Sequence, residues 1–408
     1  MDLSHPASLR DDAASAIRAN DEFVRLRRDI HAHPETGFEE HRTAALVAER
    51  LEAWGWTVVR GLGGTGLVGS LSRGAGGRAI GLRADMDALP IQEANAFAHA
   101  STVPGKMHAC GHDGHTAMLL AAAWYLAAHG RFDGTVRCIF QPAEESGQAG
   151  AKAMIDDGLF ERFPCDAVFG VHNWPGADEG DFLVRSGAFM GSSNRFRIEI
   201  AGKGGHAAQP EFAVDPMIAG AQILLGLQSV MSRNRAPNDP AVLSVTQFHG
   251  GNAVNVIPDS AWLAGTVRTH SLEVLDMVER RMREIVESTG AAYGCAARLD
   301  FERCYPPLVN DPAQTAFAAG VMRGLAGDAR VDDAAPLVMG SEDFSFMLQA
   351  RPGCYAFLGA GRGGHRLPGH GAGPCTVHNP SYDFNDALLP LGGAYFVRLA
   401  EEFLAAGG

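Results

Sequence analysis

The chain has 408 residues, too many for one ordinary hydrophobic core, so we expect two domains. Its formal net charge of −13, without any run of Lys and Arg, excludes nucleic acid and anionic membranes as partners, because both bind clustered cations. Seven scattered cysteines, no apolar run near the ~20 residues of a membrane helix, and no signal-peptide core in residues 1–21 favour a cytoplasmic protein with reduced thiols.

Helices and strands alternate along the first part of the chain. Apolar residues recur at helical spacing and predict helices at 21–30, 41–55, 114–130 and 151–160. Short apolar runs predict strands at 57–61, 66–74, 79–85, 134–140 and 165–171. This alternation predicts an open α/β sheet, in which ligands bind beyond the carboxyl ends of the strands.

The middle of the chain follows a different order. Strands are expected at 194–204, 241–251, 260–270 and 295–303, and helices at 215–233 and 271–290. Asp215 and Ser271 are predicted helix N-caps, and Pro216 suits the first position of its helix. The order β-α-β-β-α-β is the split β-α-β motif, so we expect an inserted, ferredoxin-like α+β domain at 187–304.

The remaining elements are expected to complete the first domain, which then comprises 1–186 and 305–408. They are a helix at 311–327, a polar loop at 339–346, a strand at 353–361 and a final helix. The glycine-rich stretch GLGGTG at 61–66 fits the dinucleotide pattern GxGxxG. A strand follows it where a dinucleotide site needs a helix, so nucleotide binding is not expected.

Polar residues follow three of the predicted strands: Asp85 and Asp87, Glu144 and Glu145, and His172. Adjacent residues at a strand end point to opposite sides, so one glutamate can hold a metal ion while its neighbour takes a proton from water. A solvated loop is the ordinary alternative for such a pair, but the apolar strand before it argues against that. The two aspartates can ligate a metal or orient a ligating histidine.

The stretch MHACGHDGH at 107–115 contains Cys110 and His112 on either side of a glycine, where a loop can fold round a metal ion. Two other interpretations remain open from the residues alone. Cys110 can be a nucleophile activated by a histidine, or a buried free cysteine beside surface histidines. His172 and His378 are each isolated in the sequence and by themselves would be structural. Their occurrence with the other candidates favours a metal site.

Ten stretches in this order resemble the M20 metallopeptidase family, specifically its amidohydrolase branch: HAHPETGFEE, GLRADMDALPIQE, MHACGHDGHTAMLL, FQPAEE, GVHNWP, GKGGHAAQP, NVIPD, GTVRTH, MGSEDFSF and VHNPSYDF. That branch includes hippurate hydrolases, auxin-conjugate hydrolases and N-acyl-amino-acid amidohydrolases. The resemblance spans residues 31–384. It implies a catalytic α/β domain with two metal ions, interrupted by a smaller α+β lid or dimerisation domain.

The resemblance also implies a role for each matching residue. The implied metal ligands are Cys110, His112, Glu145, His172 and His378. Glu144 is implied as the general base, and Asp87 as a residue that orients a ligand. The implied substrate-binding residues are His206, Asn255 and Arg268, with His206 reaching the active site of a partner subunit and Arg268 pairing with a substrate carboxylate. No role is implied for Asp85, His108, His115, His365 or His370.

The sequence therefore predicts a metal-dependent hydrolase that cleaves the amide bond of N-acyl amino acids such as hippurate, a small-molecule substrate. We expect a homodimer or higher homo-oligomer. The mixed sulfur, nitrogen and oxygen ligands admit manganese, zinc, cobalt or nickel. Alternatives in the same family are a dipeptidase, an N-acetyl-diaminopimelate deacetylase and an aminobenzoyl-glutamate hydrolase. A non-catalytic metal-binding protein is a more distant alternative, and Glu144 argues against it because a binder needs no base.

Overall fold

The computed structural model describes residues 8–405, and this part of the chain divides into two compact units. Unit 1 contains the chain up to Gly187, the segment Val309–Pro336, and the chain from Asp343 onward. Unit 2 contains Ala188–Leu308 and Leu337–Glu342. The last segment, which the sequence analysis assigns to the first domain, is joined to unit 2 by a hydrogen bond from the Gly191 N–H to the Val338 carbonyl (2.9 Å).

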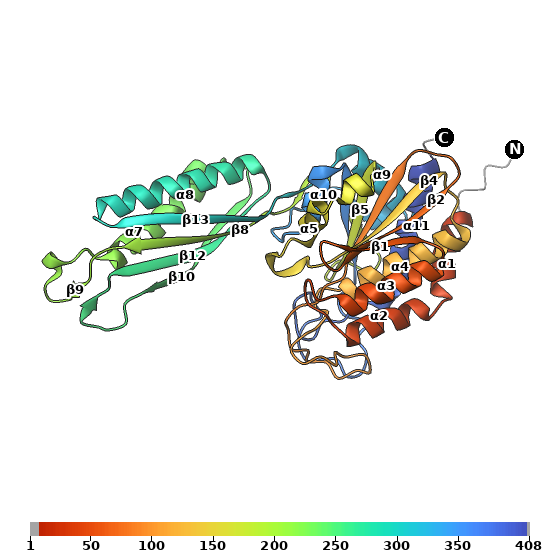
Figure 1. Cartoon of the computed structure of the whole chain (residues 1–408), viewed down its shortest axis with the longest axis horizontal. Coiled ribbons are helices and arrows are strands. Elements are labelled where there is room, and N and C mark those ends of the chain that lie inside the picture. Colours follow the sequence, from red (N-terminus) through yellow and green to blue (C-terminus); the bar gives the residue numbers. More distant parts are fainter. Residues whose placement is uncertain (1–7, 406–408) are drawn as a thin grey trace. The chain divides into compact units, whose positions relative to one another are not determined.

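Unit 1 is built on a mixed sheet with the strand order β1-β2-β4-β3-β5-β16-β6-β15, of which β1, β2, β4 and β5 are labelled in Figure 1. The four central strands β4, β3, β5 and β16 run parallel to one another, and their residues are mostly buried, as expected for strands covered on both faces. The strand bounds are β1 Thr57–Leu62, β2 Gly66–Arg73, β3 Ala79–Asp85, β4 Gly134–Gln141, β5 Ala167–Trp174, β6 Phe182–Leu183, β15 Val331–Asp332 and β16 Gly353–Gly359.

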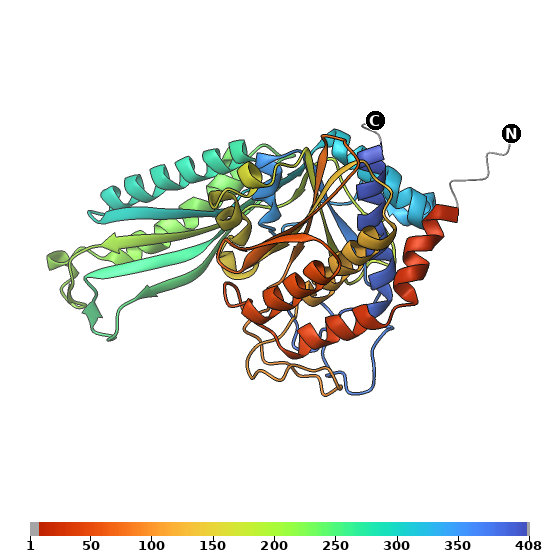
Figure 2. The same cartoon turned by 45° about the vertical axis from the view of Figure 1, so that its right-hand side comes forward.

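Helices cover both faces of this sheet. Helices α4 and α11 pack on one face, and α5 and α10 on the other. Figure 2 shows α11 (dark blue) beside the N-terminal helix α1, which it contacts. The helix bounds in unit 1 are α1 Ser8–Arg18, α2 Glu22–Ala32, α3 His41–Ala53, α4 His112–His129, α5 Gly150–Asp156, α6 Leu159–Arg162, α9 Pro312–Ala326, α10 Phe344–Ala350 and α11 Leu389–Ala405.

Two predicted helix boundaries in unit 1 differ from the structure. Helix α4 begins at His112, before the predicted start at residue 114, so the candidate metal ligand His112 lies in its first turn. The predicted helix over 151–160 is interrupted, because Gly158 adopts a left-handed φ of 84° and separates α5 from α6. Neither boundary could be derived from apolar spacing alone.

Unit 2 has an antiparallel sheet with the order β10-β12-β8-β13 and two helices, α7 and α8, packed against it. This is the predicted split β-α-β order, and the mixed α/β fold class is confirmed. The main bounds are β8 Ser193–Ala201, α7 Pro216–Ser229, β10 Ala241–Gly250, β12 Ser260–Thr269, α8 Leu272–Ala292 and β13 Ala296–Tyr305. A small pairing joins β9 (Gly205–His206) to β11 (Val256–Ile257).

Both predicted N-caps in unit 2 are confirmed. The Asp215 side chain accepts a hydrogen bond from the Met217 N–H, and the Ser271 side chain accepts one from the Val274 N–H. The helices also bury a regular apolar stripe, which in α8 includes Leu275, Val278, Met282 and Val286. Across residues 8–405, we find no helix with the length and apolar character required to cross a membrane.

Candidate metal centre

The candidate site lies in unit 1, at the carboxyl ends of three neighbouring strands. Strand β3 ends at Asp85, with Asp87 two residues later, and β4 ends at Gln141, just before Glu144 and Glu145. Strand β5 contains His172 near its carboxyl end. Because β4, β3 and β5 are adjacent and parallel, their carboxyl ends meet at the same edge of the sheet, as the sequence predicts.

A glycine turn brings Cys110 and His112 to this edge. Gly111, between them, has a left-handed φ of 96° and precedes the first residue of α4. A Cβ atom at this position would lie 2.2 Å from Asn173 Oδ1 and 2.6 Å from the Tyr382 hydroxyl. Only glycine fits, because both the backbone angle and the close contacts exclude a side chain.

The structure brings the predicted ligands and the predicted base into one cluster. Cys110 lies with His112 and His172 in one group whose ligand atoms are all within 4.8 Å of one another. Two further groups of this kind share its members and add the remaining residues: Cys110 with Glu145 and His378, and His112 with Glu144 and Glu145. The closest approaches are 3.3 Å between Cys110 Sγ and His172 Nε2, and 3.0 Å between His378 Nε2 and Glu145 Oε1.

The donor atoms of this cluster fit a pair of divalent metal ions. Asp87 Oδ1 lies 3.1 Å from His112 Nδ1, and the Asn173 carbonyl lies 2.6 Å from His172 Nδ1, so both histidines direct Nε2 into the cluster. Among the described residues, the buried His112 Nε2 forms no hydrogen bond, whereas Glu145 Oε1 has His378 Nε2 as its ion-pair partner. Buried polar atoms without hydrogen bonds are unfavourable, and a metal ion would satisfy them.

The electrostatics of the cluster also favour a cation. Burial raises the pKa of the Cys110 thiol, and the charges of Glu145 and Glu144 raise it further. Burial alone would lower the pKa of His112, but the charges of Asp85 and Asp87 outweigh it and raise the pKa to about 10. A thiol with a raised pKa is a poor nucleophile, which argues against Cys110 as the attacking group. A bound cation would favour its thiolate.

Three residues without an implied role lie close to the cluster. Asp85 accepts a hydrogen bond from Arg83 Nη1 (2.8 Å) and lies 2.6 Å from His115 Nδ1, and the other ring nitrogen of His115 lies 2.6 Å from Asn173 Oδ1. Asp85 and His115 therefore brace the ligand-bearing segments. His108 is fully buried, and burial lowers its pKa to about 3, so its ring is neutral.

The other two unassigned histidines stabilise the glycine-rich loop before His378. His365 Nε2 lies 3.0 Å from the Asp383 carbonyl, and His370 Nδ1 accepts a hydrogen bond from the Leu367 N–H at 2.8 Å. His378 itself has a left-handed φ of 62°, and its N–H donates to the Ala109 carbonyl at 2.7 Å. This backbone bond connects the C-terminal ligand segment to the segment that carries Cys110.

A buried ion-pair network, which no local sequence motif indicates, supports the same region. Arg27 on α2 is fully buried and donates to Asp383 (2.8 Å) and Asp386 (2.7 Å). His31, one turn later, lies 2.8 Å from Asp113, in the first turn of α4. The signal was present in the helical spacing, because residues 27 and 31 follow the buried Phe23 at intervals of four.

The three implied substrate-binding residues belong to unit 2. His206 in β9 pairs with Val256 of β11, and Asn255 accepts a hydrogen bond from the Ala207 N–H (3.1 Å), so these two residues lie close together. His206 is exposed, and its Nδ1 accepts from the Ala208 N–H. Arg268 lies at the opposite end of β12 from this turn and donates to Ser341 Oγ (2.9 Å).

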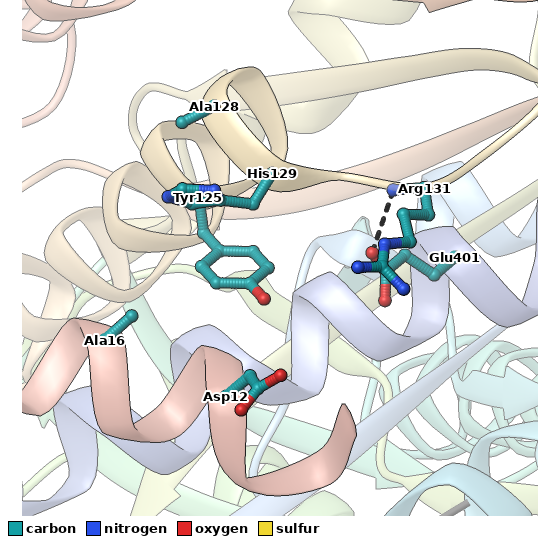
Figure 3. A pocket seen from close by; sticks show the side chains of 7 residues that line it. All are labelled: Asp12, Ala16, Tyr125, Ala128, His129, Arg131 and Glu401. Carbon is teal, nitrogen blue, oxygen red and sulfur yellow. Dashed lines mark hydrogen bonds between the residues drawn. The ribbon is translucent and has the colours of Figure 1, made fainter. Parts of the chain in front are cut away.

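A pocket in unit 1 lies between α1, α4 and α11 (Figure 3). Its lining includes Asp12, Tyr125 and Glu401, and the Arg131 N–H donates to Glu401 Oε1 at 2.9 Å. This pocket shares no residue with the metal-ligand cluster. It therefore does not extend the candidate site.

Comparisons with known proteins agree with this geometry. Residues 81–402 match the model of peptidase family M20/M25/M40. The chain is 41% identical over 383 residues to hippurate hydrolase from Campylobacter jejuni, covering 94% of this chain and 97% of that protein. It is 40% identical over 389 residues to IAA-amino acid hydrolase ILR1-like 5 from Arabidopsis thaliana, covering 94% and 87%. The crystal structure of YXEP from Bacillus subtilis, a dinuclear metal-binding peptidase of family M20, matches with a TM-score of 0.81 at 33% identity, covering 96% and 99%. The resemblance found in the sequence is thus confirmed, and the chain belongs to peptidase family M20/M25/M40.

Proposed function

We propose that this protein hydrolyses the amide bond of N-acyl amino acids, with hippurate-like compounds as substrates, and releases a carboxylic acid and a free amino acid. The observation that carries the proposal is the meeting of Glu144 and Glu145 with the Cys110, His112 and His172 cluster in unit 1. A metal ligand and a base side by side are what metal-assisted hydrolysis requires. The names of the relatives, hippurate hydrolase and IAA-amino acid hydrolase, support the substrate class.

In this proposal, Cys110, His112, Glu145, His172 and His378 hold two divalent ions. When bound, such a pair polarises the substrate carbonyl and lowers the pKa of a water toward neutrality. Glu144 takes the proton from the attacking water and then delivers it to the nitrogen of the leaving amine. Asp87 fixes the His112 ring by its contact with Nδ1.

The residues of unit 2 are assigned to the substrate. His206 donates a hydrogen bond to the developing oxyanion, and Arg268 pairs with the substrate carboxylate, with Asn255 beside His206. The family resemblance supports these assignments, together with a homodimer or higher homo-oligomer in which His206 serves the partner subunit. A cytoplasmic location is proposed from the seven scattered cysteines, which form no disulfide framework. Manganese, zinc, cobalt and nickel all suit the mixed donor set, so adding back each metal separately identifies the ion.

The test is hydrolysis of hippurate and a panel of other amides by chelator-stripped protein, with each metal added back separately. The panel includes N-acetyl amino acids, an indole-acetyl amino acid, a dipeptide, N-acetyl-diaminopimelate and aminobenzoyl-glutamate. Turnover of N-acyl amino acids that depends on metal supports the proposal, and the spread of turnover defines the pocket. If the protein instead prefers the dipeptide, N-acetyl-diaminopimelate or aminobenzoyl-glutamate, that compound would define the substrate class in place of N-acyl amino acids. Activity that ignores chelation would contradict the metal mechanism, and metal binding without turnover would indicate a binding protein.

A further inference from the structure

The turn that leads from β4 to the two site glutamates has an unfavourable backbone conformation. Ala143 has a φ of 49°, in the left-handed region that residues other than glycine rarely adopt. Its N–H donates to Glu40 Oε1 at 2.8 Å, and its carbonyl accepts from the Gly150 N–H at 3.0 Å. The direction of the chain at Glu144 therefore depends on contacts made at Ala143.

Glu40 reaches this turn from the segment before α3 and is fully buried. Its second oxygen accepts a hydrogen bond from the Thr65 hydroxyl at 2.5 Å. Thr65 lies in the glycine-rich turn at 61–66. This turn matches the dinucleotide pattern but is not expected to bind a nucleotide, so its role is otherwise unassigned. Both oxygens of the buried carboxylate are thus engaged, one by the Ala143 backbone and one by a side chain from another loop.

The 61–66 turn and the start of α5 close tightly around the residue before Ala143. A Cβ atom on Gly66 would lie 2.8 Å from Pro142 Cδ, and one on Gly150 would lie 1.7 Å from the Pro142 carbonyl oxygen. Three segments far apart in the sequence therefore meet at this turn. On its other side, the Glu145 N–H donates to Asp87 Oδ2 at 2.9 Å, so the glutamate pair is fixed at both ends.

A buried carboxylate and a left-handed alanine are each unfavourable alone. Burial raises the pKa of Glu40 to about 7, and the nearby charge of Asp87 adds to this effect. Such local violations persist where the surrounding structure enforces them, and they concentrate at functional sites. The buried carboxylate and the left-handed alanine meet one residue before Glu144. The unfavourable conformation therefore lies directly beside the proposed base and the proposed ligand Glu145.

We propose that Glu40, anchored by Thr65, is a positioning residue that holds the Ala143 turn so that Glu144 and Glu145 project into the metal centre. It acts through the backbone and touches neither substrate nor metal. The roles of Glu144 and Glu145 in this inference rest on the proposed function. The hydrogen bonds that hold the turn do not depend on it.

The test compares Glu40→Ala, Glu40→Gln and Thr65→Val with the matched control Glu39→Ala. Glu39 is the neighbouring carboxylate, but it is exposed and bonds Lys106 instead of the turn. Three quantities are measured on each purified full-length variant: kcat and KM for the best N-acyl amino acid, and cobalt(II) affinity by titration of the thiolate-to-cobalt absorption band. Near-UV circular dichroism gives the folded fraction used to normalise kcat.

Glu40→Ala is expected to lower kcat and cobalt affinity by roughly 10- to 100-fold, as loss of a group supporting a metal ligand does, with KM within about threefold. Glu40→Gln is expected to recover most of both, because its amide oxygen still accepts from the Ala143 N–H. Thr65→Val is expected to lose about 3- to 10-fold, since it removes only the anchor of the carboxylate. If Glu40→Ala does not fold, the measurements on Thr65→Val and Glu40→Gln decide whether Glu40 positions the Ala143 turn.

Glu40→Ala that matches Glu39→Ala in both measurements would overturn the inference. Glu40→Gln that is as impaired as Glu40→Ala would overturn it too, because charge and not the hydrogen bond would then be responsible. If wild-type protein hydrolyses no N-acyl amino acid, the proposed function fails, but the cobalt titrations still decide whether Glu40 holds the turn.

Discussion

Glu144 and Glu145 are neighbours with different tasks in the proposed reaction, and substitution can separate them. Glu144→Gln keeps the shape of the side chain but removes the base, so kcat should fall by about 10²- to 10⁴-fold while metal content stays at the wild-type level. Glu145→Gln should lower metal content as well, because it removes a ligand. To compare the two variants, kcat and metal content are measured on the dialysed proteins. Wild-type kcat in Glu144→Gln would show that another group is the base.

His31 provides a pH dependence of stability that is separate from catalysis. Burial alone would lower its pKa, but the charge of Asp113 and hydrogen bonds to Asp113 and Glu93 raise it to about 9. The folded state therefore holds this proton more tightly than the unfolded state, whose pKa is near 6.5. The resulting stabilisation, ~3 kcal/mol, is complete below pH 6.5 and is lost as the pH rises through 9.

Urea unfolding between pH 6 and pH 10 measures this effect. The wild-type free energy of unfolding should fall across this range more steeply than that of His31→Gln, which cannot titrate. His33→Gln is the control, because His33 lies two residues away with a half-exposed side chain. Equal slopes for the wild type and His31→Gln would show that His31 gains no proton affinity on folding.

Arg27 shows which residues of the site region sequence reasoning could not interpret. Its helix was predicted from apolar spacing, and that spacing also places residue 27 on the buried face. The sequence did not reveal its partners, because Asp383 and Asp386 lie more than 350 positions away. The candidate ligands were predicted because their motifs are local, whereas the network behind them depends on tertiary contacts.

The start of helix α4 is the element on which the metal centre depends most directly. Gly111→Ala would place a methyl group against Asn173 and Tyr382 in a left-handed backbone, so we expect a loss of stability of about 1–3 kcal/mol together with weaker metal binding. Gly320→Ala is the matched control. It lies at an exposed position of helix α9 with open space around its Cβ position, so the variant should be neutral or stabilised by up to ~1 kcal/mol.

Thermal unfolding and metal titration of both variants make this measurement. Gly111→Ala with the stability and metal affinity of Gly320→Ala would mean that the turn can relax without disturbing Cys110 and His112. The more informative failure is a stable Gly111→Ala variant that binds no metal. It would show that the glycine positions the ligands without contributing to the stability of α4.

At the level of elements, the start of a helix could be predicted from neighbouring residues, whereas the backbone conformation of a turn could not. Asp215 followed by Pro216 identified the start of α7, because both residues act within one helical turn. The polar residues after β3 and β4 were identified because alternating strands and helices predict an open α/β sheet, in which ligands bind beyond the carboxyl ends of the strands. The left-handed Ala143 was missed, since alanine carries no signal for that conformation, and only its contact with Glu40 explains it.

At the scale of the whole molecule, each of the two units has a hydrophobic core of its own among the described residues. The larger surrounds α4 and the central strands of unit 1, and the smaller lies between the sheet of unit 2 and its helices. Alternating and split patterns in the sequence predicted both cores. The segment Leu337–Glu342 was assigned to the other domain, because a short polar loop carries no pattern that shows which core it joins.

Because all six residues of the metal-ligand cluster lie in unit 1, metal should stabilise that unit selectively. A ligand that binds only the folded state at 100 times its Kd adds about 2.7 kcal/mol, which should raise the unfolding temperature of unit 1 by several degrees. Unit 2, which contributes no residue to the cluster, should unfold at the same temperature with and without chelator. Scanning calorimetry of the full chain measures both transitions.

Fluorescence identifies the transition of each unit. Trp262 is the single tryptophan in the sequence of unit 2, and the other four belong to unit 1, so the emission of Trp262→Phe reports on unit 1 alone. Chelator should lower the midpoint seen by this variant, and His112→Ala should abolish the shift because it removes a ligand. An equal shift in both units would mean that they unfold together or that metal also binds unit 2. No shift in either would remove the physical basis for a metal centre in unit 1, and with it the proposed hydrolysis.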